Sequence, residues 1–264
     1  MKTMLVDNFH TLPERADMII QIYEVNSEAE AKQLAELGVD HIGSVITPEM
    51  RWDDPGVRGA VAAAKAFGRK SSLIQFSDDF ETVSRIIDYH RPDILHFCEA
   101  LHGFAEDRLA ELLLLQLKIR ERYPFLSIMR SIPVAQSGRG ERVDTLHYAE
   151  IFAPGSDYFL TDTLLIADFD GTEEEQPVPG FVGITGKLCD LDVAARLVSS
   201  FKVPVILAGG LSPLNVAEAI EKVKPCGVDS CTLTNAIGQG GRPVRFKKDM
   251  KLVEQFVTNA KKLF

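Results

Sequence analysis

Cysteine and histidine are scarce in this 264-residue sequence, and neither is arranged for metal binding. The four cysteines form no Cys-x-x-Cys pair, and the six histidines show no His-x-x-x-His or His-Glu-x-x-His spacing of the kind that zinc sites use. Disulfides concentrate in small secreted domains that are dense in cysteine, so we expect free, buried thiols here. We therefore predict no disulfide, no metal and no cofactor.

Positive charge and long apolar runs are also in short supply. The sequence has 29 lysines and arginines against 38 acidic residues, a net charge of −9. This balance argues against binding of nucleic acid through bulk positive potential, although it leaves a local anion pocket open. No run reaches the roughly 18 apolar residues that cross a bilayer, and the start, MKTMLVDNFH, lacks the apolar core of a signal peptide. We expect a cytoplasmic protein with neither a membrane nor nucleic acid as its partner.

What the sequence does contain is a repeated unit: a short apolar or β-branched run, a turn and an amphipathic helix. Ser27 and Glu30 form an S-x-x-E capping box that predicts one helix start, and Ser212 followed by Pro213 predicts another. Predicted helices follow the strands, for example at 55–68, 105–121 and 190–200. The runs predicted to be strands span residues 18–25, 41–46, 72–76, 93–97, 125–134, 157–162, 203–208 and 227–233.

Strand-and-helix units in unbroken succession require parallel strands joined by right-handed crossovers. Eight such units fit a closed (β/α)8 barrel, the TIM barrel, as a single domain over residues 18–264. A doubly wound open sheet is the alternative, but the first strand is not followed by the Gly-x-Gly-x-x-Gly of that fold. Residues 1–17 stand outside the repeat as a predicted N-terminal extension, and the acidic stretch 168–179 is a predicted surface loop.

Barrel enzymes hold their chemistry at the carboxyl ends of the strands, where two glycine clusters occur. GITGK at 183–187 follows the acidic stretch, and AGGLSP at 208–213 ends the seventh predicted strand. Glycines at such turns let backbone N–H groups approach an anion, and a following helix adds partial positive charge. Neither cluster is a Walker loop, since Phe181 and Leu188 stand where that motif needs Gly and Ser or Thr. We predict a phosphate site; the alternative is that these glycines only permit tight turns.

The same segments carry a resemblance to a known family. GITGK and PVILAGGLSPLNVAEAIEKVKPCGVDS (204–230) follow the patterns G-G-T-G-K and P-V-I-L-A-G-G-L-x-P-x-N-V almost residue for residue. GVDHIGSVITPEMRW (38–52) and YFLTDT (158–163) are more weakly similar to its second-strand and sixth-strand patterns. Over about residues 18–262, the sequence thus resembles the phosphoribosylanthranilate isomerases of tryptophan biosynthesis.

The resemblance implies a barrel enzyme that carries out an Amadori rearrangement, an aldose–ketose isomerisation. In that reaction a carboxylic acid protonates the furanose ring oxygen, and a thiolate removes the proton from C2. The acid corresponds to Asp162, and Arg51 is similar to the arginine that holds the anthranilate carboxylate, although its spacing from Pro48 is one residue shorter. The alternatives are a turn or N-cap aspartate at 162 and a solvated surface arginine at 51.

The first strand departs from the family pattern at the base. Where the family has K-I-C-G, this sequence has Gln21, Ile22, Tyr23 and Glu24, so a phenol stands at the thiol position. A phenol with a pKa near 10 is a poor base at neutral pH, whereas a carboxylate acts directly. Strand alternation predicts, however, that Glu24 points away from the face that Tyr23 occupies.

Two further segments bear on the ligand. His96 and Cys98 alternate onto one face of the fourth predicted strand, where they are candidates to bind substrate or supply a base, or to begin a metal site. CTLTN (231–235) stands where the family has a S-S-G-x-E turn, so the hydroxyls of Thr232 and Thr234 come near the predicted phosphate. The residues predicted to bind phosphate are Gly183, Thr185, Gly186, Gly209, Gly210, Thr232 and Thr234.

Three functional hypotheses follow, all with a small sugar phosphate as the ligand. The first is a phosphoribosylanthranilate isomerase with Asp162 as acid, Arg51 as carboxylate anchor and Tyr23 in the base position. The second is a relative that acts on another phosphorylated sugar by aldol or epimerase chemistry, in which His96 or Glu24 takes part. The third is a binding protein for a phosphoribosyl compound without catalysis. The oligomeric state is left open.

Overall fold

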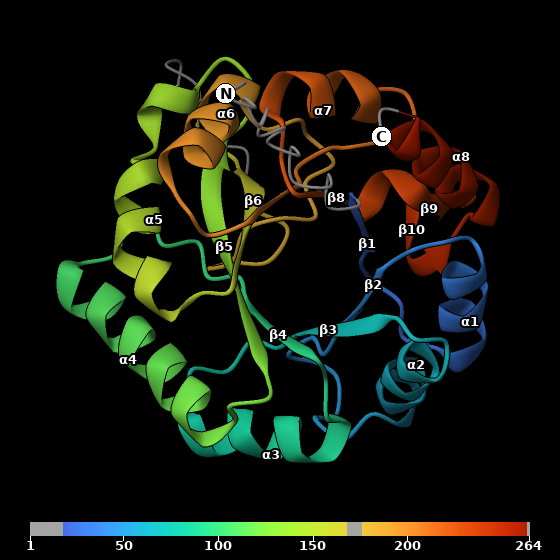
Figure 1. Cartoon of the computed structure of the whole chain (residues 1–264), viewed down its shortest axis with the longest axis horizontal. Helices are drawn as coiled ribbons and strands as arrows, with labels where there is room; N and C mark the ends of the chain where they lie inside the picture. Colours follow the sequence, from blue (N-terminus) through green and yellow to red (C-terminus); the bar gives the residue numbers. More distant parts are fainter. Residues whose placement is uncertain (1–17, 168–175, 263–264) are drawn as a thin grey trace, which may run out of the picture.

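The computed structural model describes residues 18–167 and 176–262. Within them, eight parallel strands form a closed barrel in chain order, with β8 pairing to β1 (Figure 1). The prediction of a (β/α)8 barrel is confirmed. The strands are β1 (Ile19–Ile22), β2 (His41–Val45), β3 (Lys70–Ile74), β4 (Ile94–Phe97), β5 (Ser127–Ala135), β6 (Tyr158–Leu164), β7 (Val205–Leu207) and β8 (Gly227–Ser230).

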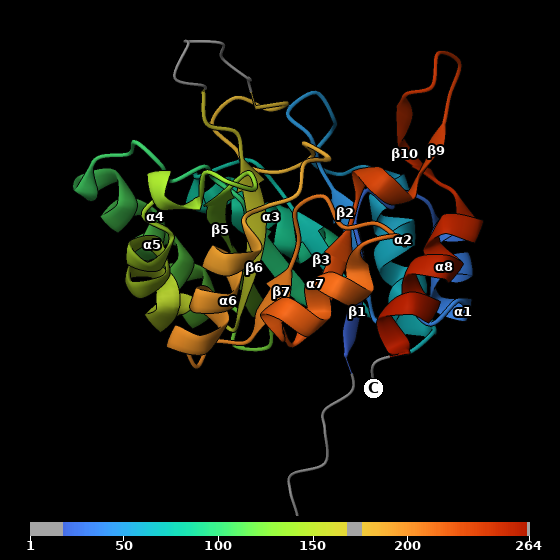
Figure 2. The ribbon, with the colours of Figure 1, turned by 90° about the horizontal axis from the view of Figure 1, so that it is seen from above.

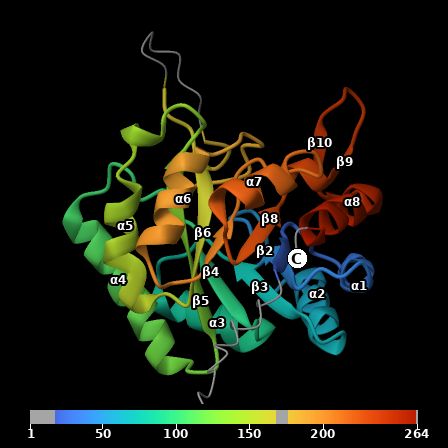
Figure 3. The same ribbon diagram turned by 45° about the horizontal axis from the view of Figure 1, so that its top comes forward.

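A ring of helices surrounds the strands, as Figures 1 and 3 show. Each helix buries an apolar stripe; α3 (Phe80–His90), for example, buries Val83, Ile86 and Ile87. In the described part of the chain, none of the helices has both the length and the apolarity to span a bilayer. The other helices are α1 (Glu28–Glu36), α2 (Pro55–Ala66), α4 (Glu106–Arg122), α5 (Thr145–Phe152), α6 (Leu191–Ser200), α7 (Val216–Val223) and α8 (Met250–Lys261).

The two predicted helix starts have different outcomes. Helix α1 begins where the sequence predicts, with the Ser27 side chain accepting a hydrogen bond from Glu30 N at 3.3 Å. The Glu30 carboxylate accepts from Lys248 N at 2.7 Å, so only half of the capping box is formed. The predicted start of α7 at Ser212 is wrong. The Asn215 carboxamide accepts from Ser212 N at 2.7 Å and closes a separate turn, and the helix begins only after Asn215.

The interior of the barrel combines an apolar layer with buried polar side chains. Tyr23 packs there with Val45, Ile94, Met129, Leu160 and Ile206. On the amino-terminal side of this layer, Gln21 Oε1 lies 3.2 Å from His41 Nδ1, and both side chains are buried. The larger apolar clusters lie outside the strands, between the barrel and its helices. The interior of the barrel is therefore a packed core, and a ligand cavity is expected at its mouth.

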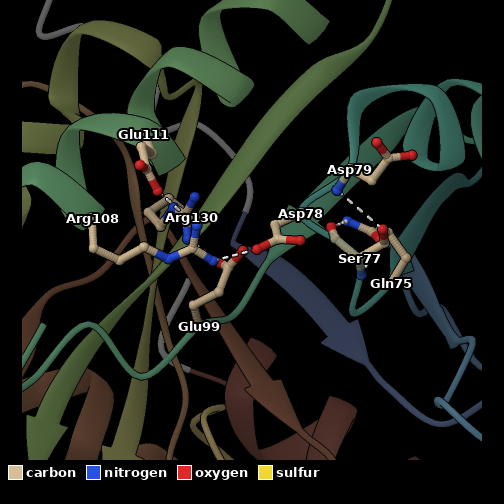
Figure 4. A network of polar contacts seen from close by, with 8 residues as sticks. All are labelled: Gln75, Ser77, Asp78, Asp79, Glu99, Arg108, Glu111 and Arg130. Carbon is tan, nitrogen blue, oxygen red and sulfur yellow. Dashed lines mark hydrogen bonds and ion pairs between the residues drawn. The ribbon is translucent and has the colours of Figure 1, made fainter.

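Behind β4 and β5, a buried ion pair joins the barrel to the helix layer. The fully buried Arg130 of β5 pairs with Glu99, and its Nε donates to Gln116 of α4 at 3.0 Å. Figure 4 draws this pair together with the exposed cluster in which Arg108 pairs with Asp78 and Glu111. The guanidinium stays charged when buried, and Glu99 and Gln116 compensate the cost of burial, so Arg130 places a fixed positive charge close to β4.

Two segments rise above the carboxyl ends of the strands. The chain after β8 forms the turn η3 (Thr232–Thr234) and an antiparallel pair, β9 (Asn235–Ile237) with β10 (Pro243–Lys248), that projects from the barrel in Figure 2. The chain after β6 crosses the mouth. There Phe181 forms an isolated antiparallel β-bridge with Glu99, and Cys189 forms one with Gln136. The predicted extension 1–17 and residues 168–175 of the predicted acidic loop lie outside the described residues.

Candidate active site

A cavity opens at the carboxyl ends of the strands, and every strand except β5 contributes to its wall directly or through the loop that follows. About 730 Å³ inside it, the open mouth included, is free of protein atoms. The structure brings most of the predicted site residues together here. Those in the lining are Tyr23, Glu24, His96, Cys98, Asp162, Gly183, Thr185, Gly186, Gly209, Gly210 and Thr232, whereas Arg51 and Thr234 lie outside it.

The two glycine clusters meet on one side of the cavity. Gly210 has a φ of +65°, and a Cβ there would lie 2.4 Å from the carbonyl carbon of Lys187, so the two loops approach more closely than any larger residue permits. Gly186, also at positive φ, lies against Thr232. Within the described residues, the N–H groups of Gly209 and Gly210 have no hydrogen-bond acceptor. Such a concave group of N–H donors suits an anion.

Thr234 takes no part in this arrangement. It is buried, and its hydroxyl donates to Cys231 O at 3.1 Å. The short turn η3 ends at Thr234, and the Thr234 hydroxyl stabilises this turn. Thr232 is therefore the one of the two predicted threonines that the structure brings to the cavity.

Two carboxyl groups face the cavity from β6 and β8. Asp162 is close to the glycine loop, since a Cβ on Gly183 would lie 2.5 Å from Asp162 Oδ2. Burial raises the pKa of Asp162 to about 7, and the hydrogen bond from Thr163 N partly offsets the rise. Burial and the Asp162 charge together raise the pKa of Asp229 to about 8. Both groups thus titrate near neutrality, where acid–base catalysts are most useful.

Tyr23 reaches across the barrel from the end of β1. Its ring lies over Gly43, where a Cβ would come within 2.3 Å of it, and its hydroxyl lies 2.6 Å from Ser72 Oγ and 2.7 Å from His96 Nδ1. Burial raises the pKa of this phenol well above its usual value of 10. The tyrosine is held protonated and fully hydrogen-bonded at neutral pH, which opposes its use as a base.

His96 continues the same chain of hydrogen bonds. Its Nε2 lies 2.8 Å from Ser131 Oγ, so both ring nitrogens are occupied. Burial and, after it, the Arg130 charge lower the pKa of His96 to about 3, and the imidazole is neutral. Cys98 lies two residues further along and is buried, which raises the pKa of its thiol well above the usual range. Within the described residues, no group of three or more His, Cys, Asp or Glu side chains is placed to hold a metal ion.

A comparison of sequences shows to which family the chain belongs. A sequence model of the N-(5'phosphoribosyl)anthranilate (PRA) isomerases matches residues 78–259. The chain belongs to this family. The matched range contains both glycine clusters and both aspartates of the cavity.

Individual isomerases show how far the similarity extends. N-(5'-phosphoribosyl)anthranilate isomerase from Methanocella arvoryzae is 34% identical over 139 residues, 53% of this chain and 53% of that protein. The isomerase from Methanothrix thermoacetophila is 27% identical over 241 residues, 90% of this chain and 95% of that protein. The alignments with the first of these and with isomerase 2 of Methanosarcina mazei span only about half of those relatives, 53% and 55%.

Among solved structures, that of the Thermotoga maritima phosphoribosylanthranilate isomerase in a monomeric form aligns with a TM-score of 0.65. The sequences are 20% identical, and the alignment covers 93% of this chain and 99% of that one. At this identity the comparison shows that the fold is shared.

Glu24 differs from its prediction. It lines the cavity and is only 1% exposed, although strand alternation predicted that it points away. Alternation does not extend this far, because β1 ends at Ile22 and Glu24 has a left-handed φ of +64°. Its carboxylate accepts hydrogen bonds from Arg245 Nε at 2.5 Å and Asn235 Nδ2 at 3.1 Å. Glu24 thus fastens the β9–β10 hairpin to the barrel.

Arg51 is predicted to hold the anthranilate carboxylate, but it lies apart from the cavity. Its side chain is 79% exposed, and it forms a two-point ion pair with Asp53, at 2.9 Å from Nε and 2.8 Å from Nη2. The neighbouring loop residues Met50 and Trp52 line a separate shallow pocket beside Phe76. The role of Arg51 remains a prediction.

Asp229 is the site residue that the sequence reasoning missed. It stands in the segment that resembles the isomerase family most closely, but the alignment alone attaches no chemistry to it. The available signal was its position near the carboxyl end of the eighth strand, two residues before Cys231, so that both side chains point to one face. In the barrel that face is the cavity.

Proposed function

We propose that this protein is an N-(5'-phosphoribosyl)anthranilate isomerase that acts in tryptophan biosynthesis. The observation that carries the proposal is Asp162, a carboxyl with a pKa near neutrality that shares one cavity with the glycine loops. Membership of the isomerase family supports the same assignment.

In this proposal the two ends of the substrate occupy opposite sides of the cavity. The phosphate binds to the N–H groups of the glycine loops, with the hydroxyls of Thr185 and Thr232 beside it. The ribose then extends toward Asp162, which protonates the furanose ring oxygen. Its raised pKa supports this role, because a carboxyl with an ordinary pKa would hold almost no proton at pH 7.

A product analogue offers a probe for this cavity. One related isomerase structure holds reduced 1-(o-carboxyphenylamino)-1-deoxyribulose 5-phosphate. We propose that the cavity of this chain binds the same analogue, phosphate toward Gly209 and Gly210.

A second candidate is the same rearrangement on a phosphorylated aminosugar without a carboxylate. Arg51 lies outside the cavity and is paired with Asp53, which removes the cation proposed to hold anthranilate. The wall formed by β2 and β3 is apolar, with Val45, Ile74 and Phe76. Such a wall favours an uncharged aglycone.

The test is turnover of phosphoribosylanthranilate, followed by the loss of its fluorescence. We expect the wild-type protein to consume it and Asp162→Asn to lower kcat/KM by about 10²- to 10⁴-fold, the usual effect of removing a general acid. Asp107→Asn is the matched control, because it removes the same charge from an exposed position on α4.

Complementation adds a test in cells. The gene should restore growth of a tryptophan-requiring strain that lacks the isomerase, and the Asp162→Asn gene should not. Good expression without growth or turnover would contradict the first proposal. Turnover of an aminosugar phosphate without a carboxylate would then support the second.

A further inference from the structure

We propose that Asp229 is the base of this isomerase and removes the proton from C2 that a thiolate removes in the family's reaction. The inference rests on the proposed function, and it names a catalytic residue that the first strand of this chain does not supply.

The position of Asp229 is the first argument. It lies near the carboxyl end of β8, in register with Gln21 of β1, and it lines the same cavity as Tyr23. The residue is only 5% exposed, yet within the described part of the chain its Oδ1 has no hydrogen-bond partner. A buried carboxyl oxygen without a partner costs free energy, so its retention in a ligand cavity indicates a role toward the ligand.

Elimination is the second argument. The Tyr23 hydroxyl and both nitrogens of His96 are committed to hydrogen bonds with one another, Ser72 and Ser131. The Glu24 carboxylate is held by Arg245 and Asn235. Desolvation raises the pKa of the two thiols in the lining, Cys98 and Cys231, well above the usual range, so both are strongly disfavoured as thiolates. Asp229 is the remaining partner for Asp162 among the described residues of the lining.

The electrostatics of the pair suit an acid and a base. The Asp162 charge makes ionisation of Asp229 harder, so the two groups lose their protons one after the other as pH rises. The groups that face Asp229 are Asp162 from β6, Gln21 from β1, Tyr23 just after β1, Cys231 just after β8, and Lys248 from β10. The Lys248 charge opposes the rise in the pKa of Asp229. Between the two ionisations the pair carries one proton, and the reaction uses the form in which Asp162 holds that proton and Asp229 is ionised.

Asp162 and Asp229 together account for every proton transfer in the proposed reaction. Asp162 gives its proton to the ring oxygen as the C1–O bond breaks, and the nitrogen lone pair forms a C1=N bond. Asp229 takes the proton from C2, whose electron pair forms C1=C2 while the C1=N electrons return to nitrogen. Asp229 then returns the proton to C1, and Asp162 regains one from the C2 hydroxyl. C1 is reduced as C2 is oxidised, so no co-reactant is needed.

The experiment compares single variants in turnover and in binding of the reduced analogue. We expect Asp229→Asn to lower kcat by about 10²- to 10⁴-fold while it still binds the analogue. Tyr23→Phe should lose far less, and Asp107→Asn serves as the surface control. Formate should restore part of the activity of Asp229→Ala, because a free carboxylate can enter the space that the side chain leaves.

The pH profile separates catalysis from structure. The wild-type kcat/KM should be bell-shaped, since the pair must carry one proton, and Asp229→Asn should lose the acidic limb. Near-wild-type turnover by Asp229→Asn, or failure of formate to rescue Asp229→Ala when the variant binds the analogue, would overturn the role of Asp229 alone. A wild-type protein that neither binds the analogue nor turns over substrate overturns the proposed function and this inference with it.

Discussion

At the scale of single residues, Tyr23 and Gly43 form one packing unit across β1 and β2. A Cβ at position 43 would lie 2.3 to 2.6 Å from three ring carbons of Tyr23, far inside van der Waals contact. The backbone at Gly43 has no left-handed φ, so the absence of a side chain there serves the tyrosine ring and not a turn. The ring of Tyr23 is thus accommodated by its neighbour in β2.

We expect Gly43→Ala to lower the free energy of unfolding by about 1 to 3 kcal/mol, the usual cost of overpacking a core. In a Tyr23→Cys background the same substitution should cost much less, because the ring is gone. Urea unfolding of the four proteins in this double-mutant cycle measures the coupling. Equal costs in the two backgrounds would refute the packing unit.

At the scale of elements, the β9–β10 hairpin is tied to the barrel by buried polar contacts. Glu24 accepts from Arg245 and Asn235, and Lys248 Nζ donates to Asn235 Oδ1 at 2.5 Å and to Cys231 O at 2.8 Å. A two-stranded hairpin is marginal by itself, so these contacts hold it beside the cavity mouth. The same contacts withdraw Glu24 from acid–base chemistry.

Glu24→Gln should therefore release the hairpin. It keeps the side-chain shape but removes the charge that Arg245 neutralises, and we expect a loss of about 1 to 3 kcal/mol in stability. Hydrogen exchange should accelerate in residues 235–248, with strands β3 to β5 unaffected. A large fall in kcat with unchanged exchange in the hairpin would instead indicate that Glu24 acts in catalysis.

At the scale of the whole molecule, the cavity carboxyls link stability to pH. The unfolded chain ionises its aspartates near pH 3.8, whereas Asp162 and Asp229 hold protons up to about 7 and about 8 in the folded protein. Between about pH 4 and pH 8 these two carboxyls therefore bind more protons in the folded state than in the unfolded state, and their contribution to the free energy of unfolding falls as pH rises. Below about pH 6.5 the buried His41 and His96 oppose this trend, because their lowered pKa values act in the other direction.

We thus expect the wild-type protein to lose stability between pH 6.5 and 8. Asp162→Asn and Asp229→Asn should each flatten that decline and raise stability at pH 8, because an amide avoids the cost of a buried charge. Urea unfolding at several pH values measures the slope, and Asp107→Asn should retain the wild-type slope. Stability that rises through this range would contradict the raised pKa values.

The features of the fold that the sequence predicts correctly depend on local patterns in the chain. The apolar runs, their spacing and the helix signals depend on neighbours in the chain, so the eight strands, the barrel and the mouth position of Asp162 follow from sequence alone. The glycine clusters are equally local, since a turn at positive φ favours glycine. The resemblance to the isomerase family rests on these same segments.

The sequence by itself determined a barrel of eight repeats with glycine-rich turns and an acidic group at its mouth. Only the tertiary structure decided which side chains share the cavity, because their partners are far apart in the chain. Asp229 feels the charge of Asp162, Tyr23 is hydrogen-bonded to His96, and Glu24 is paired with Arg245. It also left Arg51 at the surface with Asp53. Burial and pKa depend on distances across the closed barrel, and no local pattern encodes those distances.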